Sequence, residues 1–143
     1  MTSLYKFHHF GYATKSINKS EKLLLSLGFK ENSNLIHDEN LGVDVKFYTF
    51  DSSQKTIELV APIDANNNPI TSILHRGIGI YHLAFLSEKF SHTAKELRLK
   101  AISECQPAKA FSGAHIKFYV AKDLSIIELI SSVMVCKDCN DVN

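Results

Sequence analysis

The sequence lacks an excess of charge of either sign. Its 143 residues include 16 Lys and Arg against 15 Asp and Glu, which gives a formal net charge of +1. No run of basic residues is longer than two. Because domains that bind nucleic acid carry a clustered basic surface, the sequence predicts no nucleic acid partner.

Long apolar stretches are also absent. None reaches the roughly 18–20 residues that a membrane-spanning helix needs. The amino-terminal residues lack the basic and then apolar layout of a signal peptide. We therefore expect no membrane partner and a cytoplasmic location.

Cysteine is scarce, with three in the whole chain. The number is odd, Cys105 stands alone, and Cys136 and Cys139 lie in a polar tail, so the sequence predicts no disulfide framework. The Cys136-x-x-Cys139 spacing occurs in half of a zinc site and in redox pairs, but no second half follows it. We interpret these two residues as thiols of the tail.

The remaining composition, 45% hydrophobic and 22% charged, is that of an ordinary globular protein. A chain of this length commonly forms one domain and buries roughly 68–70% of its unfolded surface. We therefore expect residues 1–143 to form a single domain with a substantial core.

The most informative feature is an internal repeat. Residues 7–13 and 79–86 both show the period-two pattern of a β-strand with a histidine inside it. Each is followed by a helix-like segment, turn-rich sequence and a short apolar strand interrupted by one glutamate, at 56–60 and 126–130. A pattern repeated in this way predicts two copies of one module.

Helical spacing appears once in each half. Residues 16–27 contain Asn18 and Glu21 in the arrangement of a capping box. In the second half, Ser87 is a candidate N-cap for a helix with an amphipathic stripe. The stripe consists of Phe90, Ala94, Leu97 and Ala101.

These patterns predict the α+β fold class. Strands are expected at 4–14, 29–36, 43–50, 56–60, 79–86, 102–105, 116–120 and 126–130. Two βαβββ modules would then form a curved, mixed, eight-stranded sheet around a metal-site cavity, with the helices outside. The expected division is module one at about 4–64, a linker at about 65–78, module two at about 79–133 and a polar tail at 134–143.

His9, Glu58, His82 and Glu128 occupy matching places in the two modules. A single histidine on an apolar strand is more often a hydrogen-bonded core residue than a ligand, and a single glutamate there is usually paired or at an edge. A buried carboxylate without a partner is costly, however, and a divalent cation would compensate its charge. Imidazole and carboxylate groups together suit Mn, Fe, Co, Ni or Zn.

The other histidines have simpler interpretations. His37, His75 and His92 fall in a turn or near helix surfaces, so we expect them to be solvated. His8 alternates with His9 and should face the opposite side of the strand. His115 follows a loop, and it is a candidate for the rim of a cavity.

The chain resembles the vicinal oxygen chelate superfamily, which includes glyoxalase I, fosfomycin-resistance proteins and extradiol dioxygenases. Within it, the chain is most similar to methylmalonyl-CoA epimerases. The segments that carry the resemblance are Phe7-His8-His9-Phe10-Gly11, Ile57-Glu58-Leu59-Val60-Ala61-Pro62, Asn68-Pro69-Ile70, Gly77-Ile78-Gly79-Ile80-Tyr81-His82-Leu83-Ala84-Phe85 and Ile127-Glu128-Leu129-Ile130.

The resemblance implies that His9, Glu58, His82 and Glu128 bind the metal. It also implies proton abstraction next to a carbonyl through an enolate, with Glu58 and Glu128 as the acid/base pair. A methylmalonyl-CoA-like acyl thioester would be the substrate and a homodimer the assembly. Some epimerases carry a further glutamate as a base on the strand where this chain offers Asp44 and Lys46.

Other activities of the same superfamily remain alternatives. Epimerases often have glutamine at the position of Glu58, and glutamate there is closer to the glyoxalase pattern. A glyoxalase I-type lyase would act on an adduct of glutathione or a similar thiol. A dioxygenase would use the same residue types with iron, and a binding module would have no catalytic role.

Overall fold

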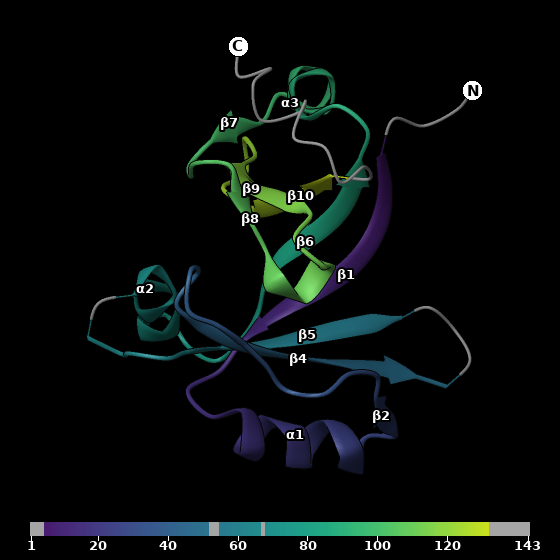
Figure 1. Cartoon of the computed structure of the whole chain (residues 1–143), viewed down its shortest axis with the longest axis vertical. Coiled ribbons are helices and arrows are strands. Elements are labelled where there is room, and N and C mark those ends of the chain that lie inside the picture. The colour runs from purple at the N-terminus through teal and green to yellow at the C-terminus, as the bar shows by residue number, and fades with distance from the viewer. Residues whose placement is uncertain (1–4, 52–54, 67, 132–143) are drawn as a thin grey trace. The chain divides into compact units, whose positions relative to one another are not determined.

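The computed structural model describes residues 5–51, 55–66 and 68–131 (Figure 1). This part of the chain contains three α-helices and ten β-strands. In chain order they are β1 (Tyr5–Ala13), α1 (Ile17–Ser26), β2 (Phe29–Glu31), β3 (Ile36–Asp38), β4 (Val43–Phe50), β5 (Thr56–Pro62), α2 (Pro69–His75), β6 (Gly79–Ser87), α3 (Phe90–Leu97), β7 (Lys100–Ala101), β8 (Gln106–Pro107), β9 (His115–Val120) and β10 (Ile126–Ser131), with a 3-10 turn at Lys109–Phe111.

The chain divides into two compact units. The first unit is His9–Tyr81, and the second unit combines the residues up to His8 with those from His82 onward. The division falls inside β1, so this one strand contributes residues to both units.

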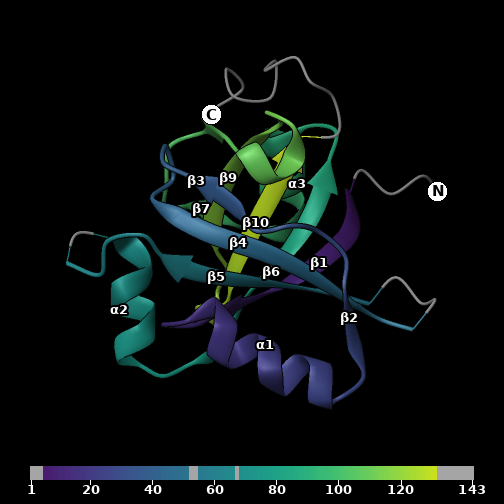
Figure 2. The ribbon, with the colours of Figure 1, turned by 60° about the horizontal axis from the view of Figure 1, so that its bottom comes forward.

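The first unit contains strands in the order β2-β4-β5-β1, with β3 also paired to β4. The β1–β5 pair is parallel, and the other pairs are antiparallel. Helix α1 lies along β4 and β5 (Figure 2). The core between the helix and the strands is centred on Leu24, Tyr48 and Leu59.

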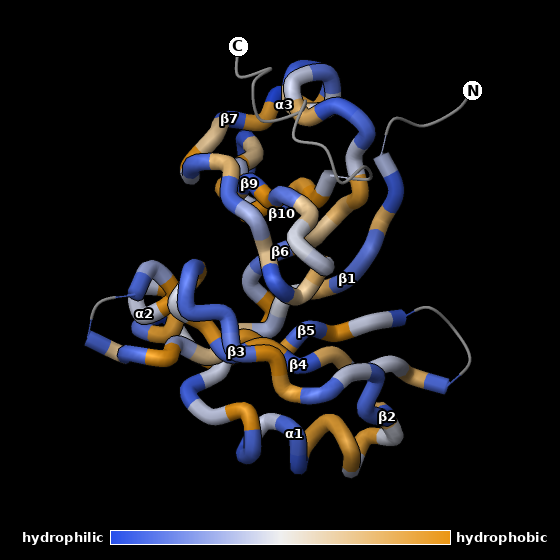
Figure 3. The backbone as a smooth tube through the Cα atoms, in the orientation of Figure 1, coloured by the Kyte–Doolittle hydropathy of each residue, from blue (hydrophilic) through white to orange (hydrophobic). Residues whose placement is uncertain are grey.

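The N-cap of helix α1 lies two residues earlier than the sequence predicts. Its N-cap is Ser16, whose side chain accepts a hydrogen bond from the Lys19 N–H, and not Asn18. Of its leucines, Leu24 is buried whereas Leu23 is half exposed. Figure 3 shows that the hydrophobic residues gather in the second half of the helix.

The single strand expected at 29–36 is two short strands, β2 and β3, which both pair with β4. Between them the Ser33 Oγ accepts a hydrogen bond from the Phe47 N–H at 3.0 Å. At this point the Ser33 side chain, in place of a backbone carbonyl, accepts the hydrogen bond from β4. The regular backbone pairing with β4 is therefore interrupted between β2 and β3.

The second unit contains strands in the order β6-β10-β9-β7, with β8 also paired to β9. The β6–β10 pair is parallel, and the other pairs are antiparallel. Its core consists of Phe90, Tyr119, Ile127 and Leu129. Phe90 comes from α3 and the other three from β9 and β10, so the helix covers this face of the strands.

Helix α3 is shorter than expected. Arg98 adopts a left-handed conformation (φ 56°) that ends the helix, so Ala101 belongs to β7 and not to the apolar stripe. Ser87 is not the N-cap, and Lys89 at that position makes no side-chain capping bond. The strand expected at 102–105 is also wrong, because the short strands β7 and β8 flank that segment.

In each unit a hydrogen bond between two buried hydroxyl groups connects a long strand to the helix that follows it, β1 to α1 and β6 to α3. In the first unit the Ser20 Oγ donates to the Thr14 Oγ1 at 2.6 Å. In the second unit the Ser87 and Thr93 hydroxyl oxygens lie 2.9 Å apart. The same connection thus occurs at corresponding places of the two halves, as the sequence repeat predicts.

The predicted α+β class with a mixed sheet is confirmed. Ten strands replace the expected eight because two predicted strands are each replaced by two short ones. The single domain, the module boundaries and the linker stay predictions. None of the helices in the described part of the chain is both long enough and apolar enough to cross a membrane.

The sequence predicts no disulfide framework, whereas Cys105 is disulfide-bonded. Cys105 packs against the core of the second unit. Cys136 and Cys139, and with them the predicted tail, lie outside the described residues.

A charged network ties α1 to β4 in the first unit. The Lys46 Nζ lies 2.7 Å from the Glu21 Oε1 and 3.2 Å from the Glu31 Oε1. The Tyr48 hydroxyl donates to the same Glu21 oxygen at 2.8 Å. Hydrogen bonds from Lys46 and from Tyr48 lower the pKa of Glu21 below its usual 4.5.

This network predicts a pH-dependent contribution to stability. A carboxylate with a lowered pKa in the folded state stabilises that state above its unfolded pKa, and the contribution is lost as the pH falls through the folded pKa. We expect Glu21→Gln to lower the free energy of unfolding by about 1 kcal/mol at neutral pH, and this difference should shrink below pH 4.5.

Urea unfolding of both proteins at neutral pH and at about pH 3 measures the difference. The control is Glu88→Gln, at an exposed position of the second unit. A Glu21→Gln effect that stays constant across this pH range would contradict the prediction.

Candidate metal centre

The first unit places a histidine and a glutamate side by side on two parallel strands. His9, on β1, and Glu58, on β5, are exposed by only 0% and 4%. The His9 Nε2 lies 3.4 Å from the Glu58 Oε1. Residues 9, 11 and 13 are the buried alternates of β1, which is why His9 and not His8 meets Glu58.

The second unit repeats this arrangement. His82, on β6, and Glu128, on β10, are exposed by 2% and 3%, and the His82 Nε2 lies 3.5 Å from the Glu128 Oε1.

The strand registers explain why the two distances agree. Glu58 pairs with Gly11, two residues after His9. Glu128 pairs with Ala84, two residues after His82. In each unit the histidine therefore has the same offset from the glutamate across a parallel pair of strands. Glycine and alanine at the paired positions present no bulky side chain beside the carboxylate.

A phenylalanine flanks each pair from the antiparallel side. Phe47 of β4 is in register with Glu58, and its ring meets the His9 ring edge-to-face, with 5.6 Å between the centroids. Phe118 of β9 is in register with Glu128, and its ring meets the His82 ring at 5.5 Å. Neither phenylalanine was predicted from the sequence.

The donor chemistry of the two pairs fits a divalent metal ion. Each of the four side chains offers one ligand atom, an imidazole nitrogen or a carboxylate oxygen. A nitrogen and an oxygen that both bind one ion at about 2.0–2.2 Å are separated by roughly 3.0–3.5 Å. The separations within the pairs, 3.4 and 3.5 Å, agree with that range and exceed those of strong hydrogen bonds.

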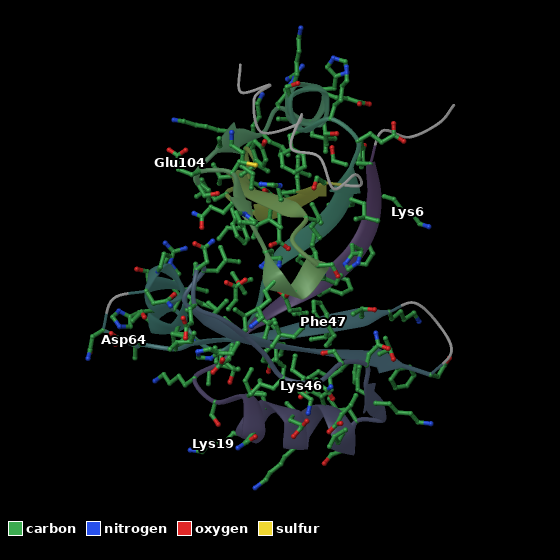
Figure 4. The ribbon with its side chains drawn as sticks, in the orientation of Figure 1. Lys6, Lys19, Lys46, Phe47, Asp64 and Glu104 are labelled. Atoms are coloured by element: carbon green, nitrogen blue, oxygen red, sulfur yellow. The ribbon has the colours of Figure 1, made fainter. Side chains whose placement is uncertain are left out.

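Asp44 and Lys46, the candidates for a second base, are engaged elsewhere. Lys46 and Phe47 point to opposite sides of β4 (Figure 4), and Lys46 binds Glu21 on the side of α1. Asp44 lies 2.6 Å from the Nδ1 of His37. Neither residue is therefore on the face of β4 that contacts His9.

The other histidines lie away from the two pairs within their units. His37 is half exposed, as predicted, although it is paired with Asp44. His8 contacts Phe111 through its ring. His115 and Phe118 are three residues apart on β9, so their side chains point to opposite faces of the strand. Because Phe118 contacts His82, His115 lies on the face away from His82.

A protein-family model matches most of the chain. The model of the Glyoxalase/Bleomycin resistance protein/Dioxygenase superfamily matches residues 8–120. No curated protein matches the sequence.

Solved structures show the same fold. A hypothetical protein of Bacillus halodurans is 22% identical with a TM-score of 0.75, over 94% of this chain and 99% of that one. The methylmalonyl-CoA epimerase of Mycobacterium tuberculosis is 24% identical with a TM-score of 0.74, over 93% and 92%. That of Streptomyces coelicolor, in complex with 2-nitronate-propionyl-CoA, is 22% identical with a TM-score of 0.70, over 92% and 99%.

Proposed function

Because the chain belongs to the glyoxalase/bleomycin resistance protein/dioxygenase superfamily, we propose that it is a metal-dependent enzyme that removes a proton next to a carbonyl group. The metal ligands in this proposal are His9, Glu58, His82 and Glu128. The observation that carries the proposal is the repetition of one buried His–Glu pair, with the same strand offset, in both units.

Two ligands are too few for a stable site of a first-row metal, which commonly has four protein ligands or three with an open position. The proposal therefore joins the two pairs on one ion, Co, Ni, Mn, Zn or Fe. When bound, such an ion supplies Lewis-acid stabilisation of the negative charge that develops on a carbonyl oxygen.

The protein's own contribution to the reaction is proton transfer. Glu58 and Glu128 come from different strands of different units, so they are two separate carboxylates that can accept and return a proton. Epimerisation needs one such group on each face of the planar enolate. Phe47 and Phe118 are the cross-strand neighbours of these carboxylates, and both carboxylates are almost fully buried.

The substrate that we propose is a methylmalonyl-CoA-like acyl thioester. The support is the resemblance of the sequence to epimerases, together with the fold shared with the two epimerases described above. Homodimeric assembly and a cytoplasmic location remain predictions.

A glyoxalase-type reaction is the second candidate. It is favoured by the carboxylate at position 58 and by the engagement of Asp44 and Lys46 away from His9. Because neither Asp44 nor Lys46 is placed to act as a base, the proton must be taken up by Glu58 or Glu128. In that case the base is itself one of the proposed metal ligands.

The test is elemental analysis of the purified protein, followed by assays with methylmalonyl-CoA and with the hemithioacetal of methylglyoxal and glutathione. We expect stoichiometric divalent metal and metal-dependent deuterium incorporation next to the thioester carbonyl. Turnover of the hemithioacetal alone would favour the second candidate. Oxygen uptake would indicate a dioxygenase, and absence of stoichiometric metal would reject the proposal.

A further inference from the structure

Phe47 and Phe118 occupy equivalent positions in the two units. Each is in register with the glutamate of its unit on the neighbouring antiparallel strand. Each also meets the histidine ring of that unit edge-to-face, with interplanar angles of 85° for His9 and 73° for His82. One aromatic side chain thus touches the imidazole and stands beside the carboxylate in both units.

The edge-to-face contact restrains a rotation that the backbone leaves free. The torsion that turns an imidazole ring is broad and has no sharp energy minima. Rotation about it moves the Nε2 atom away from the carboxylate, and a flat ring packed against the imidazole opposes that movement. The hydrophobic surroundings of a metal ligand also control access of water to it.

Two further aromatic contacts, one in each unit, join phenylalanines to each other. Phe50, which like Phe47 lies on β4, meets Phe29 edge-to-face at 5.3 Å. In the second unit, Phe85 of β6 meets Phe7 at 5.6 Å. These residues provide matched controls, because they make the same kind of contact on the same strands or in the same unit.

We propose that Phe47 and Phe118 are positioning residues for the metal centre. They hold the planes of the His9 and His82 imidazoles in the orientation that directs Nε2 toward the glutamate, and they cover one side of the carboxylate. This inference rests on the proposed metal-binding function, and it adds two residues outside the ligand set that determine metal affinity.

The test is the metal affinity of Phe47→Leu and Phe118→Leu, measured by competition with a chromophoric chelator. Leucine keeps an apolar side chain of related size but removes the flat ring. We expect affinity to fall about 10–100-fold, the loss usual for residues that support metal ligands. Phe118→Tyr should bind metal as the wild type does, because it retains the ring at a half-buried position.

Phe50→Leu and Phe85→Leu serve as controls for general loss of packing. Each should lower the melting temperature of the metal-free protein without changing metal affinity. If Phe47→Leu and Phe118→Leu change affinity no more than these controls, the inference is wrong. If the wild type itself binds no metal, the proposed function fails instead, and the two failures are distinguishable.

Discussion

Glu128→Gln is expected to lower the rate of epimerisation by about 10²–10⁴-fold, the usual contribution of a positioned acid or base. Glutamine retains an oxygen that can bind a metal but cannot take up a proton as a carboxylate does. Deuterium incorporation from solvent, followed separately for each substrate stereoisomer, measures the effect. Exchange should be lost for the stereoisomer whose proton faces Glu128.

Glu58→Gln should give the complementary result, with loss of exchange from the other stereoisomer. The control is Glu104→Gln, an exposed glutamate of the second unit (Figure 4), which should exchange both stereoisomers at the wild-type rate. Wild-type exchange of both stereoisomers by Glu128→Gln would remove Glu128 from the proposed mechanism.

Replacing either of the two histidines of the proposed metal centre should abolish stoichiometric metal binding. In His9→Ala and His82→Ala one nitrogen donor is missing, and the glutamate of the same unit loses its buried neighbour. We expect metal affinity to fall by more than about 100-fold, beyond the range typical of residues that only support ligands. Metal content after dialysis and chelator competition measure the loss.

His8→Ala is the matched control, because His8 adjoins His9 on β1 but contacts Phe111. It should retain the full metal content. Equal metal binding by His9→Ala and His8→Ala would show that His9 is not a ligand, whereas loss in both would point to damage to β1 as a whole.

The four proposed ligands could be singled out from the sequence because they depend on two regular features. The period-two alternation of β1 separates His9 from His8, and the repeat marks His82, Glu58 and Glu128 at matching places. Neither feature requires knowledge of how the strands pair. The α+β class follows from the same patterns, because long strands and amphipathic helices have distinct periods.

Strand register was beyond the reach of a single sequence. A shift of one residue between β4 and β5 would place Lys46 opposite Glu58 in place of Phe47. Nothing in the local sequence distinguishes the observed register from the shifted one. For this reason both phenylalanines were missed, and the mention of Asp44 and Lys46 rested on the resemblance to epimerases alone.

Short elements were missed for a different reason. Strands β2 and β3 are separated by a hydrogen bond from the Phe47 N–H to the Ser33 side chain, and α3 ends where Arg98 takes a left-handed conformation. Such contacts and backbone conformations depend on tertiary surroundings and leave little trace in residue type.

The division of β1 between the two units has a consequence for biosynthesis. Residues up to His8 belong with those from His82 onward, so the ribosome makes the start of the second unit long before the rest. At roughly 5–20 residues per second, the intervening His9–Tyr81 segment takes several seconds to emerge. The residues up to His8 are therefore synthesised several seconds before the strands that they contact, whereas the first unit is contiguous in sequence and can fold as it emerges.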